Sequence, residues 1–116
     1  MDLSTQQALQ IWRGAFVESV RRDGPDLSAR QMAVLTSVYL DPPPHTVRGL
    51  AEHLSISKPA ITRALDRLSS LGLVRRKPDE TDRRSIHVQR TVKGSVYLSD
   101  FASLIARSAA SVAATD

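Results

Sequence analysis

Five polar or basic residues and one proline between Ser57 and Arg67 have the spacing of the outer side of a helix and its first turn. They are Ser57, Lys58, Pro59, Thr62, Arg63 and Arg67. Arginine can hold guanine O6 and N7 in the major groove of DNA, and threonine can contact a base edge or the thymine methyl. Thr62 and Arg63 are therefore candidates for base contacts, with Ser57 and Lys58 beside them. A charged helical face is also commonly a solvated surface, so this spacing alone leaves both interpretations open.

The opposite side of the same segment is apolar and predicts the helix that presents these residues. Four residues recur at i, i+3, i+4 and i+7: Ile61, Ala64, Leu65 and Leu68. Ser57 is a favourable N-cap with Pro59 in the first turn, and Gly72 stands where a glycine ends a helix. A shorter helix is predicted at Val47–Leu54, followed by a turn at residues 55–57. Two short helices joined by a three-residue turn form a helix-turn-helix pattern.

A predicted β-hairpin follows directly, in the position of a wing. Residues 73–77 are strand-like, residues 78–84 form a charged loop, and residues 85–89 alternate with period two. Phosphate contacts position a protein on DNA without reading its sequence. We assign that role to three basic residues: Arg67, Arg75 and Lys77. We interpret Arg90 and Lys93, beyond the hairpin, as surface charge.

Positive charge is concentrated in this part of the chain. Between Ser57 and Lys93, ten basic residues stand against four acidic ones, a net charge of +6, whereas the whole chain of 116 residues carries +4. Such an asymmetry is typical of a surface that meets a polyanion, and a merely solvated face would not need it.

The run SKPAITRALDRLSSLGLVRRKPDETDRRSIHVQRTVKG resembles the multiple-antibiotic-resistance regulator (MarR) family of bacterial winged-helix transcription factors. The resemblance covers residues 27–94. The motifs that carry it are Ser57-Lys58-Pro59, Leu71-Gly72-Leu73-Val74, Asp82-Arg83-Arg84 and Thr91-x-x-Gly94. It implies an α+β, mostly α fold: a winged helix-turn-helix with flanking N- and C-terminal dimerisation helices.

The resemblance also implies a function. It indicates a sequence-specific transcriptional regulator that binds double-stranded DNA, a repressor that acts as a homodimer on a palindromic operator. In the family, a small phenolic or amphipathic effector can bind between the dimer helices and the DNA-binding lobe. The family pattern further implies that Asp82 orients Arg84, which we expect to enter the minor groove, and it adds Arg83 to the DNA-binding set. An alternative from another class is a winged helix used for protein–protein contact in a regulatory complex.

Residues 1–116 are expected to form a single winged-helix DNA-binding domain. Its parts are the winged core at residues 27–90 and the flanking helices at residues 5–22 and 91–114. The aromatic residues of the first helix, Trp12 and Phe16, could line a ligand pocket, but their spacing favours core or dimer contacts.

Several function classes find no support in the sequence. The three histidines, His45, His53 and His87, are dispersed, and no nucleophile elbow or phosphate-binding glycine loop is present. The chain has no cysteine, hence no disulfide and no thiolate metal ligand. We therefore expect a protein that is not an enzyme and needs no metal or cofactor. No apolar run is long enough to span a membrane and no signal peptide is recognisable, so we expect a cytoplasmic protein.

Overall fold

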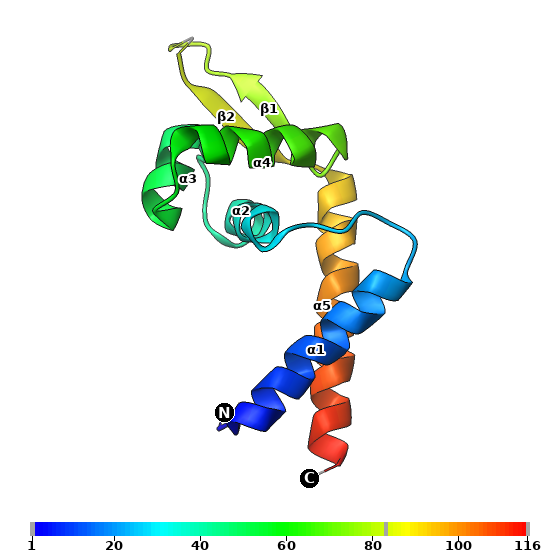
Figure 1. The fold of residues 1–116 in the computed structure, drawn as a ribbon. Helices are drawn as coiled ribbons and strands as arrows, with labels where there is room; N and C mark the ends of the chain where they lie inside the picture. The colour runs from blue at the N-terminus through cyan, green and yellow to red at the C-terminus, as the bar shows by residue number, and fades with distance from the viewer. Residues whose placement is uncertain (1, 83, 116) are drawn as a thin grey trace. The chain divides into compact units, whose positions relative to one another are not determined.

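The computed structural model describes residues 2–82 and 84–115 (Figure 1). In this part of the chain the elements follow in the order α1 (Thr5–Arg21), α2 (Ala29–Leu40), α3 (Val47–Leu54), α4 (Lys58–Ser70), β1 (Val74–Pro78), β2 (Ile86–Arg90) and α5 (Val92–Ala114). The mostly helical α+β class and the winged helix-turn-helix order are therefore confirmed. None of the helices in residues 2–82 and 84–115 is both long and apolar enough to cross a lipid bilayer.

The chain divides into two compact units, which we describe separately. The winged unit comprises Leu27–Val96, and the helical unit comprises Met1–Asp26 together with Tyr97–Asp116. Helix α5 is shared, because its first five residues belong to the winged unit and the remainder to the helical unit. That residues 1–116 act as a single DNA-binding domain stays a prediction.

The core of the winged unit is built on the apolar side of α4. Its predicted stripe and Ala60 are buried, and they pack with α2, α3 and β1. The core is completed by aliphatic residues from the neighbouring elements: Val34, Leu35, Val38, Leu50, Leu73, Val74 and Val88. Burial of this set removes apolar surface from water and fixes the side of α4 that stays exposed.

The predicted start and end of α4 are confirmed, because local features of the sequence determine them, whereas α1 ends and α5 begins one residue inside the predicted bounds of 5–22 and 91–114. The Ser57 side chain accepts a hydrogen bond from the Ala60 amide and caps α4. Ser28 and Gln31 form a capping box at the start of α2. After α4, Gly72 has φ 75°, a left-handed conformation that favours glycine.

The wing is a two-stranded antiparallel hairpin, with each strand displaced by one residue from the prediction. Val74 pairs with Arg90 and Pro78 pairs with Ile86 at the two ends of the register. Thr46 adds an isolated antiparallel bridge to His87, and the Val88 amide donates to the His45 carbonyl at 2.8 Å. The short extended segment before α3 therefore anchors β2.

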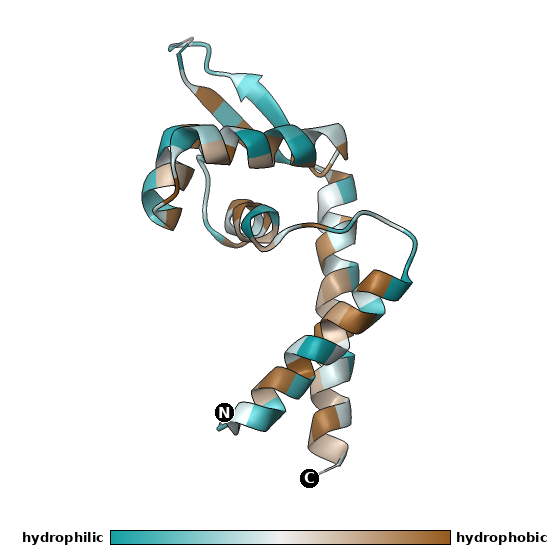
Figure 2. Cartoon of the chain, in the orientation of Figure 1, coloured by the Kyte–Doolittle hydropathy of each residue, from teal (hydrophilic) through white to brown (hydrophobic). Residues whose placement is uncertain are grey.

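In the helical unit, α1 packs on α5 through small and aromatic residues. Phe16 lies edge-on to Phe101 with ring centroids 5.5 Å apart, and the Ser108 hydroxyl donates to the Ile11 carbonyl at 2.8 Å. Ala15 is buried, whereas Trp12 is 63% exposed although its ring lies 4.4 Å from that of Phe16. Figure 2 shows hydrophobic residues recurring along the length of α1. Phe16 is thus a core contact within the chain, and Trp12 lies on an open apolar surface.

Candidate nucleic-acid interface

The outer side of α4 carries the predicted base-contact residues. Lys58, Pro59, Thr62, Arg63 and Arg67 are all exposed on this helix. Ser57 is exposed as well, but its hydroxyl oxygen is engaged by the Ala60 amide. The helix therefore presents one arginine and one threonine toward solvent in its middle turn, with cations on either side.

Strand β1 places two adjacent arginines against partners of different chemistry. Arg75 donates from Nη2 to the Gln89 amide oxygen at 3.1 Å, across the hairpin. Arg76 donates from Nη1 to the Asp66 carboxylate on α4. Lys77, the third basic residue of the strand, is exposed. The candidate phosphate contacts Arg75 and Lys77 are thus displayed on the wing, while Arg76 is bound to the helix.

Acidic side chains of the wing loop accept hydrogen bonds from other residues of the hairpin, and these bonds hold the loop in place. The Asp79 carboxylate accepts hydrogen bonds from His87 Nε2 at 3.0 Å and from the Thr81 amide and hydroxyl at 2.9 and 2.8 Å. These bonds, with that of His87 the largest contribution, hold the pKa of the Asp79 carboxyl well below its usual range.

A second carboxylate fixes the descending side of the loop. Asp82 Oδ1 accepts from the Arg84 amide at 3.0 Å, and Asp82 Oδ2 accepts from the Ser85 hydroxyl at 3.2 Å. In the structure Asp82 thus contacts the backbone of Arg84, and the role in orienting the Arg84 side chain that the family pattern implies for it stays a prediction. Arg83, the remaining wing residue of the predicted set, lies outside the described residues.

A cleft of about 510 Å³ lies between the start of α3 and the wing. Three cationic side chains line it, from α3, α4 and the wing loop respectively: Arg48, Lys58 and Arg84. Arg48 was missed by the sequence reasoning, although it directly follows the Thr46-Val47 start of α3. Its Nε lies 3.3 Å from Glu52 one turn later.

Arg90 is not mere surface charge, which corrects the prediction for this residue. Its Nε donates to the Val38 carbonyl and its Nη2 to the Asp41 carbonyl, both at 2.9 Å. Its guanidinium carbon lies 5.8 Å from the centroid of the Tyr39 ring. Arg90 therefore satisfies carbonyls at the C-terminal end of α2, where a cation is favourable.

The Tyr39 hydroxyl joins the ends of three elements. It donates to the Leu73 carbonyl at 2.8 Å and accepts from the Thr91 amide at 2.9 Å. The Thr91 hydroxyl in turn donates to the Gly72 carbonyl at 2.7 Å and accepts from the Gly94 amide, which caps α5. This network fastens the start of α5 to the end of α4 and to the wing.

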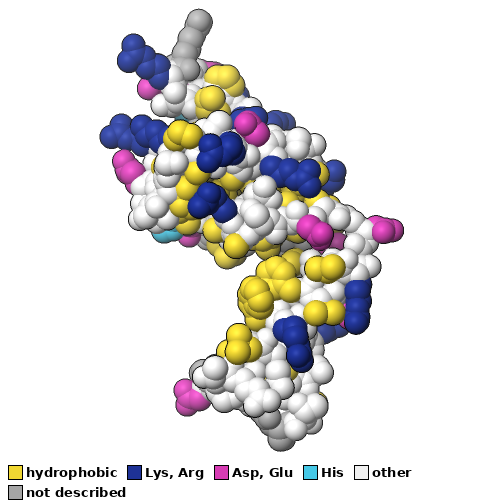
Figure 3. Space-filling model, viewed as in Figure 1, with side chains coloured by type: hydrophobic (Ala, Val, Ile, Leu, Met, Phe, Trp, Pro, Cys, Tyr) yellow, Lys and Arg dark blue, Asp and Glu magenta, His cyan; other side chains and the backbone are white. Residues whose placement is uncertain are grey.

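The winged unit displays a basic face. Figure 3 shows Lys and Arg side chains spread over this unit in the view, with fewer Asp and Glu side chains between them. The sequence indicates the same excess of basic residues, and in the structure these residues lie on α4 and the hairpin. The geometry suits a helix that enters a groove of a polyanion while the hairpin lies beside it.

Comparison with known proteins gives the family. A family model described as MarR family matches residues 26–85, just over half of the chain. A MarR transcriptional regulator from Methanosarcina mazei Go1 is 27% identical, with a TM-score of 0.65 over 89% of this chain and 70% of that one.

Two further solved structures share the fold. A MarR mutant from E. coli complexed with operator DNA is 27% identical, with a TM-score of 0.68 over 90% of this chain and 69% of that one. A MepR mutant from S. aureus is 17% identical, with a TM-score of 0.76 over 99% of this chain and 86% of that one. The chain therefore belongs to the MarR family of winged-helix transcriptional regulators.

Proposed function

We propose that this protein binds double-stranded DNA in a sequence-specific manner and represses transcription. The observation that carries the proposal is the exposed outer side of α4, with Thr62 and Arg63 at its middle, flanked by a basic hairpin. The E. coli relative complexed with operator DNA, at 27% identity, supports the same partner for this chain.

The residues on α4 and β1 divide into two kinds of contact. We assign base edges to Thr62 and Arg63, because arginine discriminates guanine through two hydrogen bonds. The start of α4 would lie at the groove, where it presents Ser57, Lys58 and Pro59. We assign phosphate contacts to the cations at the margin, Arg67, Arg75 and Lys77, which fix the register of the protein without reading bases.

The wing supplies a second point of contact in the minor groove. Asp82 binds the amide of Arg84 and the hydroxyl of Ser85, so the backbone that carries the Arg84 side chain is fixed. An arginine inserted there responds to groove width and favours narrow A·T-rich flanks. Arg83 belongs to the same proposed set.

We assign the homodimer interface to the open apolar surface of α1. Leu9, Trp12 and Val20 are 61%, 63% and 65% exposed, which is unusual for three large apolar side chains on one helix. Exposed apolar patches of this kind mark interaction sites. A two-fold dimer would place two copies of α4 about 34–36 Å apart on a palindromic operator, one turn of DNA or a multiple of it.

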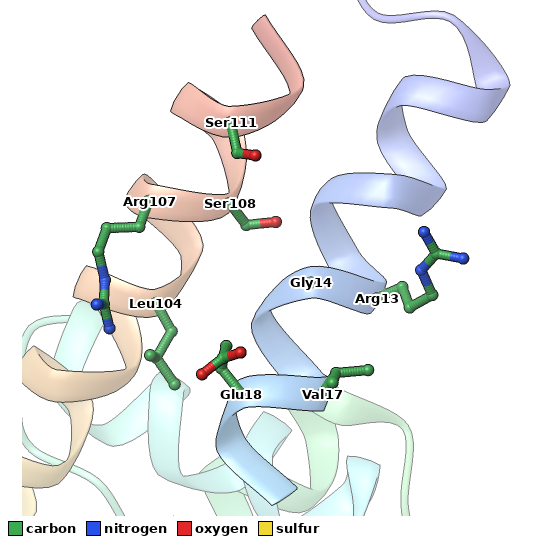
Figure 4. Close-up of a pocket in the computed structure, with 8 residues that line it drawn as sticks. All are labelled: Arg13, Gly14, Val17, Glu18, Leu104, Arg107, Ser108 and Ser111. Carbon is green, nitrogen blue, oxygen red and sulfur yellow. The ribbon is translucent and has the colours of Figure 1, made fainter. Parts of the chain in front are cut away.

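The helical unit also offers a site for a small effector. A cavity of about 330 Å³ lies between α1 and α5, within the range of small-molecule sites. Figure 4 shows Glu18 directed toward α5 and Ser108 directed toward α1, and Val17 and Leu104 provide apolar lining. A phenolic or amphipathic molecule would match this mixture of polar and apolar groups. Because α1 also carries the proposed dimer surface, such a ligand would act on the spacing of the dimer and relieve repression.

The test is selection of bound sites from a random duplex pool, followed by competition binding with two variants. Arg63→Ala should weaken binding to the selected site by about 1–3 kcal/mol and relax base preference at one position in each half-site. Arg75→Ala should weaken all duplexes alike and reduce the salt slope by about one unit.

The wing is tested on duplexes that differ only in their flanks. Arg84→Ala should lower affinity and flatten the dependence on flanking A·T content, while the preference set by Arg63 persists. If the protein selects no site and its duplex affinity is weak while a protein partner binds stably, it is a protein–protein module and the proposed function is wrong.

A further inference from the structure

We infer that Asp66 limits the sequence-independent affinity of this protein for DNA, because it holds Arg76 in an ion pair and thereby withholds this arginine from DNA phosphates. The inference rests on the proposed DNA-binding function and extends it. It concerns the electrostatic part of duplex affinity, which the operator and any other duplex share.

Asp66 is the one carboxylate among the thirteen residues of α4, and it stands on the side proposed to face DNA. It follows Thr62 by four positions and Arg63 by three, so it shares their face of the helix. Its side chain is 59% exposed. An acid at this position would repel a polyanion unless a cation compensates it.

The compensating cation comes from β1. Arg76 donates from Nη1 to Asp66 Oδ1, and its side chain is 32% exposed. The partners are ten residues apart in sequence, so the pair depends on the packing of β1 against α4. Together they contribute no net charge to the proposed interface.

The preceding residue provides an internal comparison. Arg75 stands beside Arg76 on the same strand, but its partner is the neutral amide of Gln89. Arg75 therefore keeps its full positive charge toward solvent. Two adjacent arginines thus differ in one respect that matters for DNA, which is whether an acid already neutralises them.

This difference has a consequence for affinity. Non-specific binding comes from cations that neutralise phosphates and release counterions. If Arg76 moved to a phosphate, it would leave Asp66 uncompensated against the same DNA, and the net gain in neutralised charge would be zero. The pair thus lowers the electrostatic affinity for every duplex alike without touching the base contacts.

The experiment measures salt dependence of binding with the full chain, on the selected operator and on a duplex of random sequence. In Asp66→Asn the carboxylate charge is lost and the shape is kept, so Arg76 becomes available. The magnitude of the slope of log K against log salt on the random duplex should increase by about 0.9. At 0.15 M salt this corresponds to about fivefold tighter binding, relative to equal affinities at 1 M salt.

Arg75→Gln and the double variant Asp66→Asn/Arg76→Gln form the matched controls. Arg75→Gln should reduce the magnitude of the wild-type slope by about 0.9. The double variant Asp66→Asn/Arg76→Gln should abolish the gain and keep the wild-type slope, because it removes the two opposite charges of the pair together. Thermal melting of each variant verifies that it is folded, and Asp66→Ala replaces Asp66→Asn if the latter does not fold.

Three results would overturn the inference while leaving the proposed function intact. Asp66→Asn/Arg76→Gln could reduce the slope as much as Arg75→Gln does, or Asp66→Asn could leave binding to the random duplex unchanged. Asp66→Asn could also lose affinity for the operator at a single base position, which would make Asp66 a reader of cytosine N4. A wild-type protein without salt-dependent duplex affinity would instead refute the proposed function itself.

Discussion

Gly94, the third residue of α5, has no room for a side chain. A Cβ atom added there would stand far inside van der Waals contact with the Tyr39 hydroxyl and the Leu73 carbonyl oxygen. One of these neighbours is backbone and cannot rotate away. The other is the hydroxyl that joins α2 to the Leu73 carbonyl and the Thr91 amide. Gly94→Ala should therefore destabilise the fold, although alanine is the better helix former.

The magnitude follows from three contributions. Overpacking costs about 1–3 kcal/mol, and displacing the Tyr39 hydroxyl from two partners costs about 1 kcal/mol for each hydrogen bond. The helix propensity of alanine returns about 1 kcal/mol. The expected net loss is about 2–4 kcal/mol in the free energy of unfolding. For a chain of this size it lowers Tm by about 8–16 °C.

Thermal and urea unfolding followed by circular dichroism measure this loss, with all variants at one protein concentration. Gly49→Ala on α3 is the matched control, because its Cβ would meet only the Thr46 hydroxyl, at 3.2 Å. That variant should stay within about 1 kcal/mol of the wild type. If Gly94→Ala melts at or above the wild-type temperature, the packing around the Tyr39 hydroxyl does not constrain the fold as argued.

Further predictions concern the end of α2, the wing loop and the dimer. Arg90→Ala should cost about 1–2 kcal/mol in chemical unfolding, because two carbonyls of the α2 terminus lose a charged donor. Folding lowers the pKa of Asp79, so the ionised carboxylate stabilises the native state at every pH above the pKa of the unfolded state. This stabilisation is lost as the pH falls from the pKa of the unfolded state toward that of the folded state. The stability advantage of the wild type over Asp79→Asn should therefore hold above about pH 5 and shrink as the pH falls below about 4, and an advantage independent of pH would show that the bond to His87 has no such effect. Trp12→Glu, or Leu9→Glu on the same surface, should weaken the proposed homodimer by at least about tenfold in sedimentation analysis. A wild-type protein that sediments only as monomer would contradict the proposed interface.

Features set by neighbouring residues were predictable from the sequence. Capping requires a side chain and an amide three positions apart, so Ser28 and Ser57 could be assigned without knowledge of the fold. Gly72 could be assigned because a left-handed residue after a helix is usually glycine. The bounds of the wing strands were displaced by one residue, since their register also depends on the distant bridge between Thr46 and His87.

Contacts between residues far apart in sequence were not predictable. From the sequence we interpreted Arg90 as surface charge, because no neighbouring residue indicates that the α2 carbonyls lie within hydrogen-bonding distance of its side chain. The same holds for the pairing of Asp66 with Arg76. Periodicity on α1 likewise gave an apolar stripe but not its partner, so it could not tell Phe16, which packs on α5, from the exposed Trp12.

The wing loop shows why counting charges misjudges a binding surface. In the sequence, the acids and arginines of residues 79–84 could simply cancel one another in solvent. In the structure, the Asp79 carboxylate accepts hydrogen bonds from His87 and Thr81, and the Asp82 carboxylate accepts one from the Arg84 amide. The two carboxylates thus accept hydrogen bonds from the hairpin itself, and these bonds order the backbone of the loop. The Arg84 side chain is carried on that ordered backbone at the cleft beside α3. In the DNA contact that we propose for Arg84, this order would lower the conformational entropy lost on binding, and preorganisation of this kind raises affinity without any added contact.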